Sequence, residues 1–356
     1  MVTLLVGTDR GLFAFDSDEH RRQWRARAPV HRGWQVYSVW PDARTEPASI
    51  WAGLSSAFYG PHLQRSRDGG SSWEPVESPR FPDGSPRRLH QIWSLAAVPG
   101  SGGMRAGTSE AALFSSAGGD GWEWNQGLEA HPSRPHWSPG AGGLCLHSIV
   151  HDATDPGRIF IGISAVGVLR SDDGGASWAL KNAGVTAPVE EEEPKYTEVM
   201  CCVHGLVQDP ADPSRLYQQN HTGVYRSLDG GERWDRIESG LPSNFGFPIL
   251  MHPRKPRTLF LAPLAADEDR TFPGGRPGVF RTDDGGDHWV RTAHGLEDPC
   301  YSGVLRGAMT ADAEDEPGIY FGTTGGDVYA SLDEGEQWSR LPGRLPRVLS
   351  VAALTR

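Results

Sequence analysis

The amino-acid sequence predicts an all-β fold, a seven-bladed β-propeller made of four-stranded antiparallel blades. Two observations indicate it: a turn motif that recurs along the 356 residues, and short apolar segments separated by regular turn signals. A repeat of about 50 residues is typical of a chain built from one stacked unit, and four short strands per unit are typical of a propeller blade. We therefore expect residues 1–356 to form a single propeller domain.

The turn motif reads Ser/Thr-x-Asp-x-Gly-x-x-Trp. Its complete copies are Ser66–Trp73, Ser171–Trp178, Ser227–Trp234, Thr282–Trp289 and Ser331–Trp338, while Ser115–Trp122 lacks the aspartate and Asp18–Trp24 keeps only a remnant. Asp can accept hydrogen bonds from backbone amides in a turn, Gly can adopt a positive φ, and Trp can pack over the turn. Because the motif recurs in every repeat, we expect its aspartates to be structural.

The segments between the motifs alternate as strands expected of a blade. The innermost strands are expected at residues 34–41, 89–97, 144–151, 202–209, 246–253, 304–312 and 347–354. The chain itself begins with a second-strand segment at residues 2–7. The segment at residues 347–354 is therefore expected to complete the first blade and cover its edge.

The motif resembles the Asp-box, or BNR repeat, of sialidase-like and glycosyl-hydrolase-like propellers, and the resemblance covers nearly the whole chain. It implies a propeller fold with the boxes at the blade periphery. It does not extend to sialidase activity. Sialidases have six blades, an Arg-Ile-Pro motif and three arginines that grip the sialic acid carboxylate, whereas this chain has no Arg-Ile-Pro and offers only Arg306 with Arg347 nearby.

Composition narrows the classes of partner. A net charge of −11 argues against nucleic acid or an anionic membrane surface. No apolar run reaches the roughly 20 residues that span a bilayer. The first residues lack the basic region of a signal peptide, and the four cysteines form no CxxC pair. We expect a cytoplasmic protein.

Residues that differ between repeats mark the candidate site. One position of the inner strands forms a column of Tyr37, Trp93, His147, His204, Phe247, Arg306 and Leu349, and the position two residues earlier includes Gln91, Cys145 and Cys202. Strand alternation places both columns on one side, which we expect to be the channel. The connections between second and third strands add Tyr59, Glu110 and His221. His147, His204, His221 and Glu110 are expected to converge on the channel mouth at blades 3 and 4.

The residue types in this set suit two kinds of chemistry. Neutral imidazoles are ligands of Zn²⁺ and similar divalent ions, so the metal ligands are expected to be His147, His204 and His221. A metal-free site with a histidine general base remains open. The catalytic residues are expected to be His147, His204, Glu110 and Arg306, the arginine as an anion clamp. Substrate contacts are expected from Tyr37, Gln91, Trp93, Phe247 and Tyr59.

The functional hypothesis is therefore a hydrolase-like enzyme, assisted by a divalent metal ion, that processes a small molecule or carbohydrate. The alternative is a non-catalytic binding or assembly scaffold, as in seven-bladed Asp-box proteins that resemble photosystem assembly factors. The connections at residues 123–143 and 179–200 are long for a compact domain and are expected to act as lids or binding loops.

Overall fold

The computed structural model describes residues 1–187 and 199–356. Within these residues the strands form seven four-stranded antiparallel sheets, which confirms the expected all-β, seven-bladed propeller class. The chain divides into two compact units: the first contains Met1–Ser56, Gln64–Glu74 and Glu238–Arg356, and the second contains Ala57–Leu63 and Pro75–Ile237. In the described residues no helix is long and apolar enough to cross a bilayer.

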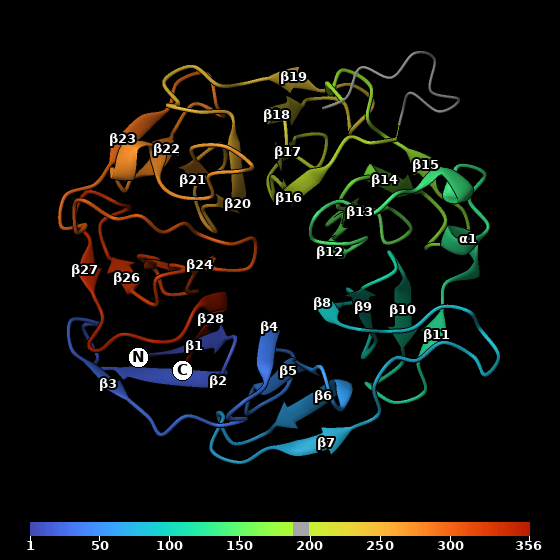
Figure 1. Cartoon of the computed structure of the whole chain (residues 1–356), viewed down its shortest axis with the longest axis horizontal. Coiled ribbons are helices and arrows are strands. Elements are labelled where there is room, and N and C mark those ends of the chain that lie inside the picture. Colours follow the sequence, from blue (N-terminus) through green and yellow to red (C-terminus); the bar gives the residue numbers. More distant parts are fainter. Residues whose placement is uncertain (188–198) are drawn as a thin grey trace. The chain divides into compact units, whose positions relative to one another are not determined.

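The first unit contains three complete sheets (Figure 1). One has the order β28 (Val348–Thr355), β1 (Val2–Thr8), β2 (Gly11–Ser17) and β3 (Trp24–Ala26). The next has β20 (Phe245–Met251), β21 (Leu259–Leu264), β22 (Val279–Thr282) and β23 (Val290–Thr292), with a short 3-10 helix η2 (Pro273–Gly275). The third has β24 (Met309–Ala311), β25 (Ile319–Gly322), β26 (Val328–Ser331) and β27 (Ser339–Arg340).

The second unit also contains three complete sheets. The first has β8 (Ile92–Ala97), β9 (Met104–Thr108), β10 (Leu113–Ser116) and β11 (Glu123–Trp124). The second has β12 (Leu146–His151), β13 (Ile159–Ile163), β14 (Gly167–Ser171) and β15 (Ala179–Leu180). The third has β16 (Val203–Gln208), β17 (Leu216–Asn220), β18 (Gly223–Ser227) and β19 (Asp235–Arg236). Its helices are α1 (Gln126–Glu129) and the 3-10 helix η1 (Arg134–His136).

The remaining sheet has the order β4 (Gln35–Asp42), β5 (Ser49–Ser56), β6 (Gly60–Ser66) and β7 (Glu74–Val76). Its strands are divided between the two units. Each unit has its own apolar core because the second strands are buried on both faces: β1 in the first unit and β13 in the second are buried along their whole length.

The C-terminal strand completes the first sheet, as the sequence predicts. β28 pairs antiparallel with β1 from Val2 opposite Thr355 to Thr8 opposite Val348. The backbone amide of Arg356 also donates to the Met1 carbonyl (2.9 Å). The labels of the two termini accordingly lie beside each other in Figure 1. The pairing satisfies an edge of β1 that would otherwise be exposed.

One expected inner strand is wrong in its extent. The sequence predicts a strand over residues 304–312, but β24 covers only Met309–Ala311. The chain instead makes a turn in which the Ala308 amide donates to the Leu305 carbonyl (3.0 Å). A turn consumes the hydrogen bonds that a longer ladder would need, so Arg306 lies before the strand.

The repeated motif folds as a hydrogen-bonded turn. In the first complete copy, Ser66 Oγ donates to Asp68 Oδ1 and accepts from the Gly70 amide (both 2.8 Å), while Asp68 Oδ1 also accepts from the Ser72 amide (2.8 Å). The same pattern recurs at Ser171, Ser227, Thr282 and Ser331. In the degenerate copy the hydroxyl that accepts from a glycine amide, that of Gly119, belongs to Ser116, one residue after the Ser115 that the motif predicts.

Three motif tryptophans, Trp234, Trp289 and Trp338, dock on the preceding blade through a glycine. The Trp234 amide donates to the Ala183 carbonyl (2.9 Å), and a Cβ on the next residue, Gly184, would lie 2.2 Å from the Trp234 carbonyl oxygen. Gly184 also has a φ of 94°, which L side chains rarely adopt. The same arrangement recurs where Trp289 meets Gly240 and where Trp338 meets Gly295.

We predict that Trp234→Ala destabilises the protein by about 3–5 kcal/mol, because it removes a large side chain from a close-packed site. Trp234 is 1% exposed, and its Nε1 donates to the Lys181 carbonyl (2.7 Å). The free energy of unfolding from urea titrations measures the effect. Trp122→Ala is the matched control, because Trp122 closes the degenerate motif and is only half-buried. Equal losses in the two variants would contradict the docking role.

Acid is predicted to weaken the motif turns. Hydrogen bonds lower the pKa of Asp68 and of Asp173 from the ordinary 3.8 to about 2, first among them those from Ser72 and Ser177. Because the folded-state pKa lies below the unfolded-state value, this stabilisation is complete above about pH 4 and is lost as the pH falls through about 2. Melting temperatures from pH 5 to 2 should fall less steeply for a double Asp68→Asn, Asp173→Asn variant than for the wild type, and Asp315→Asn should follow the wild type.

Candidate functional site

The residues that the sequence aligns in one column occupy irregular points of the inner strands. In six sheets the pairing with the second strand shifts register at this position, which holds Tyr37, Trp93, His147, His204, Phe247 and Leu349. At a β-bulge two residues oppose one, which bends the strand and re-aims a side chain. The column is therefore a repeated bulge, and the residue at the bulge differs from sheet to sheet.

Three side chains of the second unit bring metal-ligand atoms close together. One donor atom from each of Cys202, His204 and His221 lies within 4.8 Å of the other two. The two imidazole rings meet edge to face, with centroids 5.6 Å apart. His204 is buried and the other two residues are half-buried. Two predicted metal ligands, His204 and His221, therefore lie together, and Cys202 joins them.

The pairing of β16 with β17 positions this trio. Cys202 and His204 flank Val203 at the start of β16, and Val203 pairs with Asn220 at the end of β17. His221 follows directly, and its backbone amide donates to the Cys202 carbonyl (2.8 Å). The Asn220 side chain donates to the Cys201 carbonyl (3.3 Å). The backbone is thus fixed on both sides of the three donor atoms.

His147 occupies a different place from the other predicted ligands. It lies on β12, where its Nε2 is 2.9 Å from the Val203 carbonyl oxygen and its Nδ1 is 2.9 Å from Ser148 Oγ. A neutral imidazole satisfies both contacts when Nε2 donates and Nδ1 accepts. His147 therefore joins β12 to β16 beside the trio and is outside the group of close donor atoms found in the described residues.

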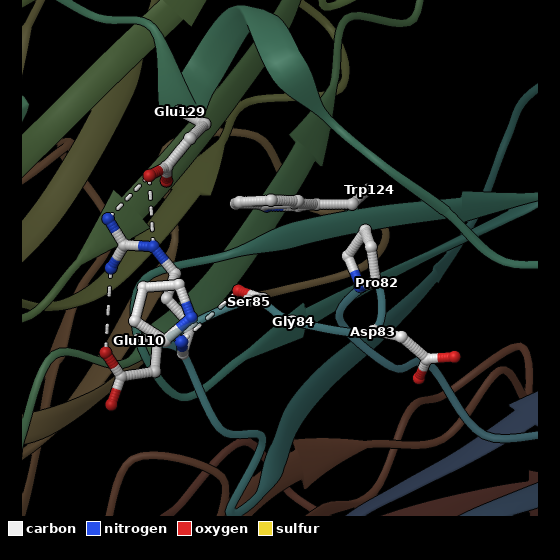
Figure 2. A pocket seen from close by; sticks show the side chains of 9 residues that line it. Pro82, Asp83, Gly84, Ser85, Glu110, Trp124 and Glu129 are labelled. Atoms are coloured by element: carbon white, nitrogen blue, oxygen red, sulfur yellow. Dashed lines mark hydrogen bonds and ion pairs between the residues drawn. The ribbon is translucent and has the colours of Figure 1, made fainter.

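Glu110 lies in a separate hollow of about 680 Å³ (Figure 2). It occupies the turn between β9 and β10 with a φ of 62°. Arg87 lies between two carboxylates there: its Nη2 is 2.6 Å from Glu129 Oε1, and its Nη1 is 3.6 Å from Glu110 Oε2. Trp124 and Pro82 also line the hollow, and Figure 2 shows the indole edge-on above the loop that carries Pro82.

The connection at residues 123–143, expected to be a lid or binding loop, supports this hollow. Its helix α1 (Gln126–Glu129) is capped by Asn125, whose side chain accepts from the Leu128 amide (2.7 Å). Arg134 donates to Glu129 (3.1 Å) and to the Glu110 carbonyl (2.5 Å), and its guanidinium lies over the Trp137 ring. Whether the connection closes over a ligand stays a prediction. The connection at residues 179–200 lies partly outside the described residues.

Three of the predicted substrate contacts, Gln91, Trp93 and Tyr59, belong to the second unit. Trp93 on β8 and Gln91 just before it are half-buried; the Ser109 amide donates to the Gln91 carbonyl (2.9 Å), and the Gln91 amide donates to Ser109 Oγ (3.3 Å). Tyr59 lies between β5 and β6, is 74% exposed, and its carbonyl lies 3.1 Å from His62 Nε2.

The other predicted site residues belong to the first unit. Phe247 is buried on β20, and the guanidinium of Arg306 lies 4.7 Å from its ring centroid. Arg270 contacts the same ring at 5.5 Å. Tyr37 is half-buried on β4. Phe247 and Arg306 therefore form a cation–π pair.

Comparison with known proteins shows the fold alone. No family model and no curated protein matches the chain. Among solved structures it is similar to an ancestral GH74 enzyme (18% identity, TM-score 0.57, covering 86% of this chain and 38% of that one). It is also similar to a GH74 enzyme from Niastella koreensis (14%, 0.56, 97% and 68%) and to YCF48 bound to a D1 peptide (16%, 0.56, 89% and 84%). The chain thus spans well under half the length of the ancestral GH74 enzyme.

We predict that His147→Ala costs about 1–3 kcal/mol of stability, because the Val203 carbonyl loses its side-chain donor. His20→Ala, an exposed substitution, should change stability by less than about 0.5 kcal/mol. Urea unfolding of both variants measures the difference. A His147→Ala protein as stable as the wild type would show that the contact between β12 and β16 is not supported by this ring.

Proposed function

We propose that the chain is a metal-assisted, hydrolase-type enzyme in which Cys202, His204 and His221 hold a divalent cation. The observation that carries the proposal is that their three donor atoms lie within 4.8 Å of one another. Zinc–ligand distances of about 2.0–2.3 Å in a tetrahedral site place ligand atoms about 3.3–3.8 Å apart. Small side-chain rotations would close that difference without moving the backbone.

The donor set favours zinc over the hard cations. One thiolate and two imidazoles suit a borderline-soft ion, whereas Mg²⁺ and Ca²⁺ prefer oxygen ligands. The sulfur must be reduced to bind, which agrees with the cytoplasmic location that the sequence predicts. The expected ligand His147 is replaced in this proposal by Cys202, and His147 becomes a positioning residue that holds β16 at Val203.

Among residues 1–187 and 199–356 the trio supplies three ligands, and a tetrahedral ion held by these three alone has one open position. When bound, such an ion supplies a water whose pKa is lowered to about 7, and so a hydroxide nucleophile at neutral pH. Closed structural zinc sites use four protein ligands, so the three-residue set is the feature that favours catalysis. Esters and phosphoesters of small molecules are the substrates that such a nucleophile would hydrolyse.

A glycan is a second candidate substrate, favoured by the hollow that contains Glu110, Glu129 and Trp124. Paired carboxylates and an aromatic wall are features of sugar-processing sites. The repeated Ser/Thr-x-Asp-x-Gly-x-x-Trp turns, which resemble the Asp-box, agree with this candidate. The GH74 enzymes and YCF48 share the fold, and the likeness favours neither an enzyme nor a scaffold.

Metal analysis of protein purified without a histidine tag tests the proposal. We expect the wild type to bind zinc stoichiometrically, and Cys202→Ser, His204→Ala and His221→Ala to lose it. Replacement by Co²⁺ should give a thiolate charge-transfer band that Cys202→Ser abolishes. Binding should weaken as the pH falls, because protons compete for the ligands.

Two control variants separate ligands from neighbours. Cys145→Ser alters another buried thiol, and His147→Gln alters the neighbouring imidazole; both should retain the metal. Metal retained by Cys202→Ser and His204→Ala would reject the site. Stoichiometric metal with no metal-dependent hydrolysis of aryl esters, phosphate esters or aryl glycosides would reject the enzyme and favour the scaffold.

A further inference from the structure

A second groove of about 640 Å³ lies in the second unit, next to the hollow of Figure 2. The two share Pro82 and Arg87 in their linings. The groove is formed by residues 77–90, which join β7 to β8, together with Pro61 and His62 at the start of β6. It contains none of the three proposed metal ligands.

The charge of this groove is opposite to that of the chain. Its lining carries Arg80, Arg87 and Arg88 against one acid, Glu77, in a protein of net charge −11. Arg87 is committed to the carboxylates of the adjoining hollow. A Glu77 carboxylate oxygen accepts from the Gly121 amide (3.0 Å).

Arg80 and Arg88 are the arginines of the groove whose guanidinium groups form no ion pair in the described residues. Both are exposed. Guanidinium groups present planar pairs of N–H donors that match carboxylate and phosphate oxygens. Two such groups on one groove, neither ion-paired with a carboxylate in residues 1–187 and 199–356, favour an anion from solution.

The walls of the groove are apolar and held by a stiff backbone. Pro79 is buried, and Phe81 and Leu89 are half-buried. Pro79, Pro82 and Pro86 restrict the connection, because each fixes its φ angle. The connection is anchored near both ends: Ser78 Oγ accepts from the Leu63 amide (2.8 Å) and Ser109 Oγ accepts from the His90 amide (2.8 Å).

We propose that this groove binds a small organic anion, a phosphate monoester or carboxylate whose apolar body lies on the proline and phenylalanine wall and whose charge meets Arg80 and Arg88. His62 and His90 also line the groove. The site is independent of the proposed metal centre and stands whether or not that centre binds zinc.

Calorimetric titration with phenyl phosphate and with benzoate, in low salt and with EDTA present, tests the site on the full chain. EDTA removes any metal that would itself bind the anion. We expect a dissociation constant of about 1 mM, which added NaCl should raise because exposed charges are screened. Arg80→Gln with Arg88→Gln should weaken it at least about tenfold, and both residues are exposed, so the variant should fold.

Matched controls define the outcomes that overturn the proposal. Arg233→Gln removes another exposed arginine of the same unit and should leave the affinity within about twofold. Benzyl alcohol, which lacks the charge, should not bind. Failure of both anions to bind, or equal binding by the double variant, rejects the groove. Inorganic phosphate that binds as tightly as phenyl phosphate rejects the role of the apolar wall.

Discussion

The structure depends on one repeated contact, the docking of a motif tryptophan on the glycine that follows the preceding blade. The tryptophan amide donates to the carbonyl just before that glycine, and its own carbonyl fills the space where a Cβ would be. The contact recurs at three junctions between consecutive sheets, where Trp234, Trp289 and Trp338 meet Gly184, Gly240 and Gly295, and it fixes how closely the two sheets approach there. The inner strands, with their bulges, are then presented in equivalent positions. Variation at the bulges is tolerated because the docking contact lies elsewhere on the blade.

Most of the fold follows from the sequence because the turn chemistry is local. Ser66, Asp68 and Gly70 make their hydrogen bonds within a few residues, so the motif predicts the turn directly. The completion of the first sheet by β28 follows from counting strands. Gly184, Gly240 and Gly295 each follow a motif tryptophan by six residues in the sequence. The contact that requires a glycine there is made by the next blade, so the sequence spacing alone does not predict it. The turn before β24 is not predicted, because residues 304–312 align with the inner strands of the other blades.

The candidate site was less predictable, since it depends on side-chain direction at a bulge. Simple alternation groups His147 with His204, yet the register shift lets His147 contact Val203 of the next sheet while His204 contacts His221. Cys202 was visible as a residue two positions before His204. Arg87 and Glu129 come from connections between sheets, Trp124 ends the outer strand β11, and no periodic pattern marks these residues. Their only sequence signal is the unusual length of residues 123–143 and the prolines around Arg87.

The pairing of β1 with β28 has a consequence for the order of events during synthesis. Of the strands of the propeller, β1 is synthesised before all the others and its partner β28 after them. Throughout translation of the intervening residues, a strand that is buried along its whole length in the folded state presents an open edge. Such an edge can pair with another nascent chain, and long-range pairings of this kind form slowly. The edge of β1 is thus the part of the molecule that a chaperone would protect most usefully from pairing with another chain before β28 is synthesised.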